Sequence, residues 1–275
     1  MVPTPRDVAT PLGRIRVSVA GDGPAMLFWP SLMMTGELWS AQVAHFAPTH
    51  TTIAVDPPGH GASAPLTGPF SFDDCVEVIT AIFDDLAVEQ AVLVGNSWGA
   101  MIGARYAAMR PARVTAAVLL NGTASPAGLR QRIEYPLLVR AARLFGGIRG
   151  PLTGPALDAF LGPTTRRSRP EVVARVLATI QAADPASVGH AVTSVVPQRP
   201  DQRRLLRAVT CPVLVVAGDE DATFPVAECA ELAAAIPDAE FVVLPGVAHL
   251  AAVEVPDLVS ELIGGFLTRS PSGQK

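Results

Sequence analysis

The chain has 275 residues, of which 49% are hydrophobic and 17% are charged. This length suits one α/β domain with an insertion, and the apolar content excludes a disordered chain. A formal net charge of −4 argues against a nucleic-acid partner, because phosphate binding needs clustered positive charge.

Two short apolar segments near the N-terminus predict the first strands. They span residues 15–19 and 25–29, and Gly21-Asp22-Gly23 lies between them. Glycines on both sides of an aspartate favour a hairpin turn. We therefore expect these segments to form an antiparallel pair at the edge of a sheet.

Five later segments are too uniformly apolar to alternate between a buried and an exposed side, which predicts strands covered on both faces. They span residues 51–56, 91–95, 114–120, 212–217 and 240–244. Helical patterns lie between these strands, with Pro or Gly close to many of their boundaries. They span residues 38–46, 72–86, 98–109, 226–236 and 256–267. Strands and helices in turn predict a mostly parallel sheet flanked by helices.

The alternation breaks once, between residues 125 and 209. No comparable buried strand is evident there, and prolines interrupt helical patterns that are rich in Arg. We interpret this stretch as a helical insertion over the sheet. The predicted organisation is a core of residues 1–124 and 210–270, a helical insertion of residues 125–209, and a polar tail of residues 271–275.

A pentapeptide in the middle of the chain carries the strongest chemical signal. Gly95-Asn96-Ser97-Trp98-Gly99 follows an apolar strand and begins a helix, the context in which a G-x-S-x-G motif presents a nucleophile. Serine at such a sharp turn has a strained backbone, so small residues are needed two positions before and after it. The backbone N–H of Trp98 then lies at a helix N-terminus, where it can stabilise an oxyanion. The motif predicts Ser97 as the nucleophile.

A serine hydroxyl is a weak nucleophile until a base takes its proton, and the chain has five histidines. Only His249 follows the last predicted strand on a loop, just before the closing helix. His45 and His50 flank a helix end, and His60 lies in a predicted turn. His190 lies in the insertion, where it could contact a substrate. The sequence therefore predicts His249 as the general base.

The base in turn needs a carboxylate that holds its ring in one tautomer. Such a residue belongs on a loop that follows a strand of the sheet, and Asp219, Glu220 and Asp221 all follow the penultimate predicted strand. Local chemistry does not choose among these three acids.

Together these motifs resemble the α/β-hydrolase fold superfamily, in its cap-bearing branch of esterases, lactonases, cofactor-free haloperoxidases and C–C bond hydrolases. The resemblance covers nearly the whole chain. It is carried by residues 29–32, 56–63, 95–99, 218–221, 246–249 and 254–256. It implies a mostly parallel eight-stranded sheet flanked by helices, with a helical cap inserted after the sixth strand. It also implies Asp221 as the triad acid and the backbone N–H of Leu32 as the second oxyanion donor beside that of Trp98.

Two features resemble different branches of this superfamily. Pro30-Ser31 stands where many relatives carry His-Gly, and Ser31-Leu32 is similar to the enol-lactonase branch. Gly95-Asn96-Ser97 is similar to the corresponding motif of C–C hydrolases that cleave ring-fission diketones, but the Gly-rich oxyanion segment of that group is missing. We therefore rank hydrolysis of an ester or lactone first. C–C hydrolysis and cofactor-free haloperoxidase or perhydrolase chemistry follow, and a non-catalytic ligand-binding member ranks last.

Apolar residues near the predicted site favour a neutral, hydrophobic ester or lactone. The resemblance to the family implies a preference for a lactone, with a macrolactone among the candidates. Neither a metal nor an organic cofactor is implied. The predicted pocket residues are Trp29, Met33, Met34, Leu137, Phe160 and His190. A core role is the alternative for the first five, and an ordinary position on a helix face is the alternative for His190. The expected partner is a small hydrophobic ester or lactone, with no nucleic acid and no membrane, and a homo-oligomer is compatible with the sequence.

The remaining composition predicts a cytoplasmic protein. No apolar segment follows the N-terminal charges, and no apolar run of eighteen residues predicts a membrane span. Cys75, Cys211 and Cys229 are odd in number and widely spaced, which favours reduced thiols. Arginine clusters at 166–169 and 199–207 have Pro and acidic neighbours, and we interpret both as solvated surface without a function.

Overall fold

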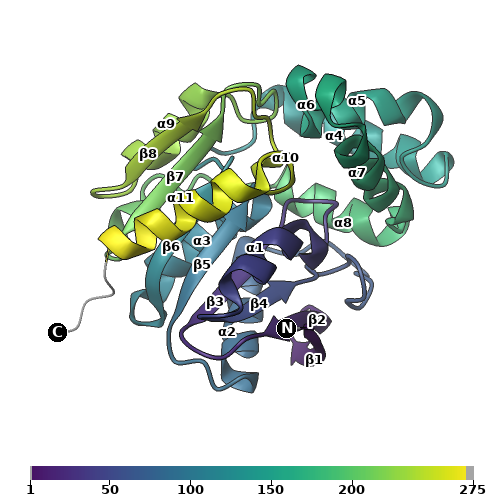
Figure 1. Ribbon diagram of the computed structural model, residues 1–275. Helices are drawn as coiled ribbons and strands as arrows, with labels where there is room; N and C mark the ends of the chain where they lie inside the picture. Colours follow the sequence, from purple (N-terminus) through teal and green to yellow (C-terminus); the bar gives the residue numbers. More distant parts are fainter. Residues whose placement is uncertain (1, 271–275) are drawn as a thin grey trace.

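A computed structural model describes residues 2–270, so the predicted tail at 271–275 lies outside the described residues (Figure 1). Eight strands form one sheet in the order β1-β2-β4-β3-β5-β6-β7-β8. The first two pairings, β1 with β2 and β2 with β4, are antiparallel, and the other neighbours are parallel. The strands are β1 Thr4–Thr10, β2 Gly13–Ala20, β3 Ala25–Trp29, β4 Thr51–Val55, β5 Ala91–Asn96, β6 Val114–Leu120, β7 Val213–Gly218 and β8 Glu240–Leu244. The predicted eight-stranded, mostly parallel sheet is confirmed.

The hairpin expected between β2 and β3 is wrong. β2 pairs with β1 and β4, whereas β3 lies between β4 and β5. All five residues of β3 are buried, so it needs cover on both faces and a neighbour on each side. Gly21 and Gly23 have φ of 88° and 140°, and a Cβ on Gly21 would overlap the carbonyl oxygens of Ala47 and His50. These glycines let the chain pass close to the end of α1 instead of folding back on β2.

Helices cover both faces of the sheet because its strands alternate their side chains between two apolar clusters. Met26 and Phe28 of β3 face the helices α1 and α11, whereas Leu27 and Trp29 face α2, α3 and α9. The core helices are α1 Ser40–Phe46, α2 Phe72–Asp85, α3 Trp98–Met109, α9 Val226–Ala234, α10 Ala251–Glu254 and α11 Pro256–Arg269. Short 3-10 helices are η1 Gly36–Trp39, η2 Pro111–Arg113, η3 Gly150–Leu152 and η4 Leu205–Ala208. None of the helices within residues 2–270 has the length and apolar content that crossing a membrane requires.

Between β6 and β7 the chain folds into five α-helices that lie together at one end of the sheet (Figure 1). They are α4 Leu129–Leu144, α5 Thr153–Phe160, α6 Pro163–Ser168, α7 Pro170–Ala182 and α8 Pro185–Val195, and we call residues 129–195 the helical insertion. The α8 helix joins this insertion to the core. Its Ser187 and Ser194 hydroxyls accept hydrogen bonds from the backbone N–H groups of Leu66 and Phe70, at 2.9 and 2.7 Å.

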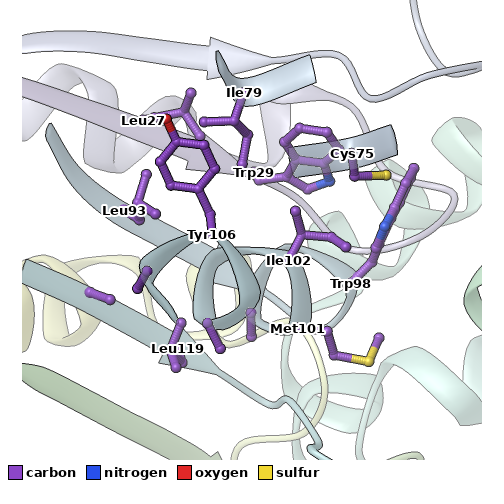
Figure 2. Packing of buried hydrophobic residues seen from close by; sticks show 14 of the residues in the cluster. Leu27, Trp29, Cys75, Ile79, Leu93, Trp98, Met101, Ile102, Tyr106 and Leu119 are labelled. Atoms are coloured by element: carbon purple, nitrogen blue, oxygen red, sulfur yellow. The ribbon is translucent and has the colours of Figure 1, made fainter. Parts of the chain in front are cut away.

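The α3 helix packs against the sheet, and Trp98, Ile102 and Tyr106 are among its buried side chains (Figure 2). A Cβ on Gly99 would overlap the carbonyl oxygen of Trp29, and a Cβ on Gly95 would overlap the backbone of Gly99. The indole of Trp98 meets that of Trp29 edge to face, with ring centroids 5.4 Å apart. The start of α3 therefore depends on two positions without side chains.

This close approach predicts a different cost for alanine at two glycines one turn apart in α3. We expect Gly99→Ala to lower the free energy of unfolding by about 3 kcal/mol, because the new methyl group meets backbone that cannot rotate away. Gly103→Ala is the matched control, since its Cβ would meet side chains at 3.4 Å and 3.9 Å. Urea unfolding measures both. Equal stability of the two variants would contradict the packing described above.

Candidate active site

Ser97 occupies the turn between β5 and α3, with φ of 55° and ψ of −108°. A positive φ is costly for a residue with a side chain, so the surrounding contacts must hold it. Its backbone N–H donates to the carbonyl of Leu120 at 2.8 Å, and its carbonyl accepts from Met101 N at 3.0 Å. The strained turn predicted from the motif is therefore present and is anchored at both ends.

His249 and Asp221 form a buried pair on the loops that follow β8 and β7. The Nδ1 atom of His249 lies 2.8 Å from Oδ2 of Asp221. The Asp221 carboxylate also accepts from Thr223 N at 2.8 Å, Phe224 N at 3.1 Å and the amide of Asn121 at 3.0 Å. Burial by itself raises the pKa of Asp221, but the charge and hydrogen bond of His249 and the two backbone donors outweigh it and hold that pKa below its ordinary value. An ionised Asp221 fixes Nδ1 as the protonated nitrogen and leaves Nε2 of His249 free to accept a proton.

The other two acids that local chemistry allowed have different contacts. Asp219 accepts a hydrogen bond from Gly246 N at 2.7 Å. Glu220 accepts from the backbone N and the hydroxyl of Thr164 in α6, at 2.9 and 2.6 Å. Of the three carboxylates, Asp221 is the one bonded to His249, while Glu220 holds the start of α6.

The loop after β3 carries the predicted oxyanion donor Leu32. Its neighbour Met33 has φ of 66° and donates its N–H to Nε2 of His60 at 3.0 Å. The other ring nitrogen of His60 lies 2.9 Å from the carbonyl of Pro58, so Nδ1 donates there and Nε2 accepts. Within residues 2–270 neither Leu32 N–H nor Trp98 N–H has a hydrogen-bond acceptor, which leaves both free for a ligand. His60, expected only as a turn residue, thus positions the Leu32 loop.

Glu254 fixes the histidine loop from both sides. It is only 1% exposed. Its Oε1 accepts from the N–H groups of Ala248 and Leu250, the two neighbours of His249, each at 3.1 Å. Its Oε2 accepts from the hydroxyl of Thr165 in α6 at 2.6 Å. In the sequence, Glu254 belongs to a segment that carries the family resemblance, but no role was predicted for it. A carboxylate within a short apolar helix, five residues after His249, was the feature that could have indicated a structural role.

Asn96 adds a direct link between the nucleophile turn and the histidine loop. Its amide nitrogen donates to the carbonyl of His249 at 2.9 Å. Asn96 is fully buried next to Ser97, so this bond joins the two loops inside the protein. Residues on β5 and on the loop after β8 are thereby held together although 153 positions separate them in the chain.

A cavity of about 240 Å³ opens above these groups. Ser97, His249, Leu32 and Met33 lie at its base, and the predicted Phe160 lines its wall. Most of the wall is apolar and comes from the helical insertion, including Leu138, Val139, Ile148, Leu152, Val188 and Val192. No group of His, Cys, Asp and Glu side chains in the described residues could hold a metal ion, and the three cysteines are free.

Four residues predicted to line the pocket do not line this cavity. Trp29 and Met34 are buried in the core on opposite faces of the sheet. Leu137 is 57% exposed, because the face of α4 that lines the cavity carries residues 131, 135, 138, 139 and 142. His190 lies off the face of α8 that carries Val188, Gly189 and Val192. Which face of a helix meets the cavity depends on how the insertion docks.

Two residues that the sequence did not single out do line it. Phe224 follows the acid loop, and its ring centroid lies 5.6 Å from that of His249. Arg199 is buried at 4% exposure, so its interpretation as solvated surface is wrong. The segment around Arg199 folds inward because its backbone bonds to residues that precede the insertion, including Ala127. The sequence could have indicated Phe224, because it lies three residues after the predicted acid. Nothing in the sequence indicated that Arg199 would line the cavity.

The buried His60 ring predicts a pH-dependent contribution to stability. Burial lowers the pKa of His60 from 6.5 to about 4, so the neutral ring stabilises the fold fully above pH 6.5. We expect this contribution, on the order of 3 kcal/mol, to be lost as the pH falls from 6.5 through 4, because the unfolded chain binds the proton first.

Urea unfolding of wild type and His60→Gln at stepped pH measures this effect as the difference between the two curves. The variant should show a weaker dependence over the same interval. His45→Gln, at an exposed position, is the control and should follow wild type. Parallel curves for wild type and His60→Gln would refute a neutral, buried acceptor at this position.

Known proteins share this arrangement of strands and helices. A family model described as the alpha/beta hydrolase fold matches residues 24–256. The chain is 28% identical over 249 residues to 3-oxoadipate enol-lactonase 2 of Acinetobacter baylyi, which covers 90% of each chain. It is 28% identical over 270 residues to 2-(acetamidomethylene)succinate hydrolase of Mesorhizobium japonicum, covering 93% of each.

Among solved structures, a malate-bound thermophilic esterase from Thermogutta terrifontis superimposes with a TM-score of 0.89 and 25% identity. The match covers 97% of this chain and 99% of the esterase. The family model extends from β3 to the start of α11 and so includes every loop of the site described above. The chain therefore belongs to the alpha/beta hydrolase family.

Proposed function

We propose that this hydrolase cleaves a carboxylic ester or lactone through an acyl-enzyme on Ser97, with His249 as general base and Asp221 as the acid that orients it. The observation that carries the proposal is the shared cavity. Ser97 at its strained turn and His249 with its ring fixed by Asp221 both face this cavity. A nucleophile, an oriented base and an accessible substrate space are the parts that acyl transfer requires.

In the first half of the reaction, Nε2 of His249 takes the proton of the Ser97 hydroxyl as Oγ attacks the substrate carbonyl carbon. The carbonyl oxygen becomes an oxyanion and accepts hydrogen bonds from the free N–H groups of Leu32 and Trp98. When the tetrahedral intermediate collapses, the bond to the leaving oxygen breaks and His249 returns its proton to that oxygen. An ester releases an alcohol at this step, whereas a lactone keeps its hydroxyl attached to the acyl group.

In the second half, water replaces the leaving group. His249 takes a proton from this water, and the resulting hydroxide attacks the acyl carbon. Collapse of the second oxyanion breaks the bond to Oγ, Ser97 regains its proton from His249, and the carboxylic acid leaves. Asp221 stays ionised throughout and stabilises the imidazolium that forms twice in each cycle.

The cavity wall supports a substrate with an apolar body. Apolar residues of the helical insertion line most of it, so burial of hydrocarbon contributes roughly 25 cal/mol per Å² of apolar surface removed from water. The relatives named above include an enol-lactonase and an esterase, and these names support lactone and ester bonds as the first ones to assay. We propose a small-molecule substrate of this class.

Three variants test the assigned roles. Ser97→Ala should abolish labelling by a fluorophosphonate probe and lower hydrolysis of p-nitrophenyl esters and lactones by about 10⁴-fold or more. Asp221→Asn should lower kcat by about 10⁴-fold, because the His249 ring loses its orienting charge. Asp219→Asn is the matched control on the same loop, and it should retain activity within a few fold, as roughly expected for a carboxylate without contact to the base.

Folded wild-type protein that resists the probe would exclude the proposed hydrolase and leave a ligand-binding member of the family. Full activity of Ser97→Ala would exclude the acyl-enzyme. If Asp219→Asn were as damaging as Asp221→Asn, the acid would be wrongly assigned. Product analysis by mass spectrometry identifies which bond is cleaved.

A further inference from the structure

Arg199 brings a positive charge into an otherwise apolar cavity. It lies between α8 and η4, is 4% exposed, and lines the same cavity as Ser97 and His249. Its guanidinium carbon lies over the ring of Phe224, 5.4 Å from the centroid, and that ring also contacts His249. Arg199 therefore belongs to the wall next to the base.

Within residues 2–270 no carboxylate forms an ion pair with Arg199, although the negative charge of Glu228 acts on it from farther away. The Nε atom of Arg199 donates to the carbonyl of Ser125 at 2.9 Å, and Nη2 donates to Oε1 of Gln131 at 3.1 Å. Both acceptors are neutral, and none of the ion pairs in the described chain includes Arg199. The nearby Glu228 accepts a hydrogen bond from the Thr123 hydroxyl at 2.7 Å instead.

A buried guanidinium without an ion-pair partner lowers the stability of the folded protein. Burial lowers the pKa of Arg199, which expresses the penalty for removing its charge from water. An arginine nevertheless stays protonated in proteins, so the folded protein retains this buried charge without an ion-pair partner, which lowers its stability. A ligand carboxylate at this position would offset this loss of stability.

One edge of the guanidinium remains available to such a ligand. Nη1 has no acceptor among residues 2–270, and protein atoms do not fully enclose it. Tyr135, one helical turn after Gln131, lines the same cavity, and its hydroxyl also has no partner in the described chain. An arginine nitrogen and a phenol hydroxyl can each donate to one oxygen of a carboxylate.

Among the residues that line the cavity, Arg199 is the natural partner for the carboxylate of a ligand. Apart from His249, Arg199 is the one ionisable basic residue that lines the cavity, and neither Asp nor Glu lines it. Aliphatic side chains of the insertion occupy most of the remaining wall. A substrate that fits has an apolar body, one reactive carbonyl at Ser97 and one negative charge directed to Arg199.

We propose that Arg199 and Tyr135 bind a carboxylate of the substrate, so that the ester or lactone cleaved at Ser97 carries a free carboxylate as well as the reactive bond. This substrate class rests on the function proposed above. The alternative role for Arg199 is purely structural, since its bonds to Ser125 and Gln131 tie together the segment that precedes the insertion and the start of α4.

The test compares monomethyl suberate with dimethyl suberate, which share an apolar chain and an ester but differ by one carboxylate. Calorimetry on Ser97→Ala measures binding without turnover, and kcat/KM of wild type for both compounds measures hydrolysis. We expect the monoester to bind and react roughly 10- to 100-fold better, the range for one charge-assisted contact. Equal binding of the two esters would overturn the proposal without a further variant.

Arg199→Gln and Tyr135→Phe then locate the effect. Arg199→Gln should reduce the monoester-to-diester ratio of kcat/KM by about 10-fold or more, mainly through KM, and Tyr135→Phe by a few fold. Arg132→Gln is the matched control, because Arg132 is exposed on α4 and does not line the cavity. Its ratio should equal that of wild type.

An equal loss on both esters in Arg199→Gln would assign Arg199 the structural role and overturn the proposal. Binding on Ser97→Ala does not depend on chemistry at Ser97. A monoester preference in binding together with an inactive wild type would therefore overturn the proposed hydrolysis while the carboxylate site stands. Thermal unfolding of each variant verifies that it is folded.

Discussion

The site depends on the close backbone contact between the start of α3 and the sheet. Gly99 lies against the carbonyl of Trp29, and Gly95 lies against Gly99, so no side chain separates the turn from the strands. This contact holds Ser97 at a positive φ and directs the first N–H groups of α3 toward the cavity. It also sets the distance between β5, which leads into Ser97, and the loop after β3, which carries the Leu32 N–H. A larger residue at either glycine would move both.

Buried polar side chains then join the loops that the sheet brings together. His60 holds the Leu32 loop, Glu254 holds the two N–H groups around His249, and Asn96 bonds to the carbonyl of His249. Each satisfies a backbone group that has no partner in a strand or helix, which is the condition for a loop to be buried. Glu220 and Glu254 also bond to Thr164 and Thr165 at the start of α6. The loops that carry Asp221 and His249 are thus tied to the helical insertion that covers them.

Much of the fold, and the position of Ser97 and His249 at one cavity, was predictable from local pattern. Strands buried on both faces have uniformly apolar sequences, and Ser97 and His249 each follow one of them in the context that their roles need. The first edge of the sheet was predicted less well. β1 is mostly exposed and polar, so its sequence lacks the uniformly apolar pattern of a buried strand. The predicted pairing of β2 with β3 was wrong. Glycines near an aspartate are compatible with a hairpin turn, but they also let the chain pass close to the residues that follow α1. Local chemistry left three acids open, and the contact of Asp221 with His249 is a property of two loops that lie 28 residues apart.

Apart from β1 and the short α10, the sequence by itself determined the succession of core strands and helices along the chain, the turn at Ser97 and the presence of a helical segment after β6, because each follows from residues that are neighbours in the chain. The tertiary structure decided which side chains face the cavity. Trp29 and Met34 pack into the core on opposite faces of the sheet, and the docking of α4 and α8 turns Leu137 and His190 away from the cavity. Arg199 came inward from a polar, Pro-flanked segment that resembles surface in sequence. Its surroundings are built from residues near 125, 131 and 224, and only folding brings these distant positions around one charge.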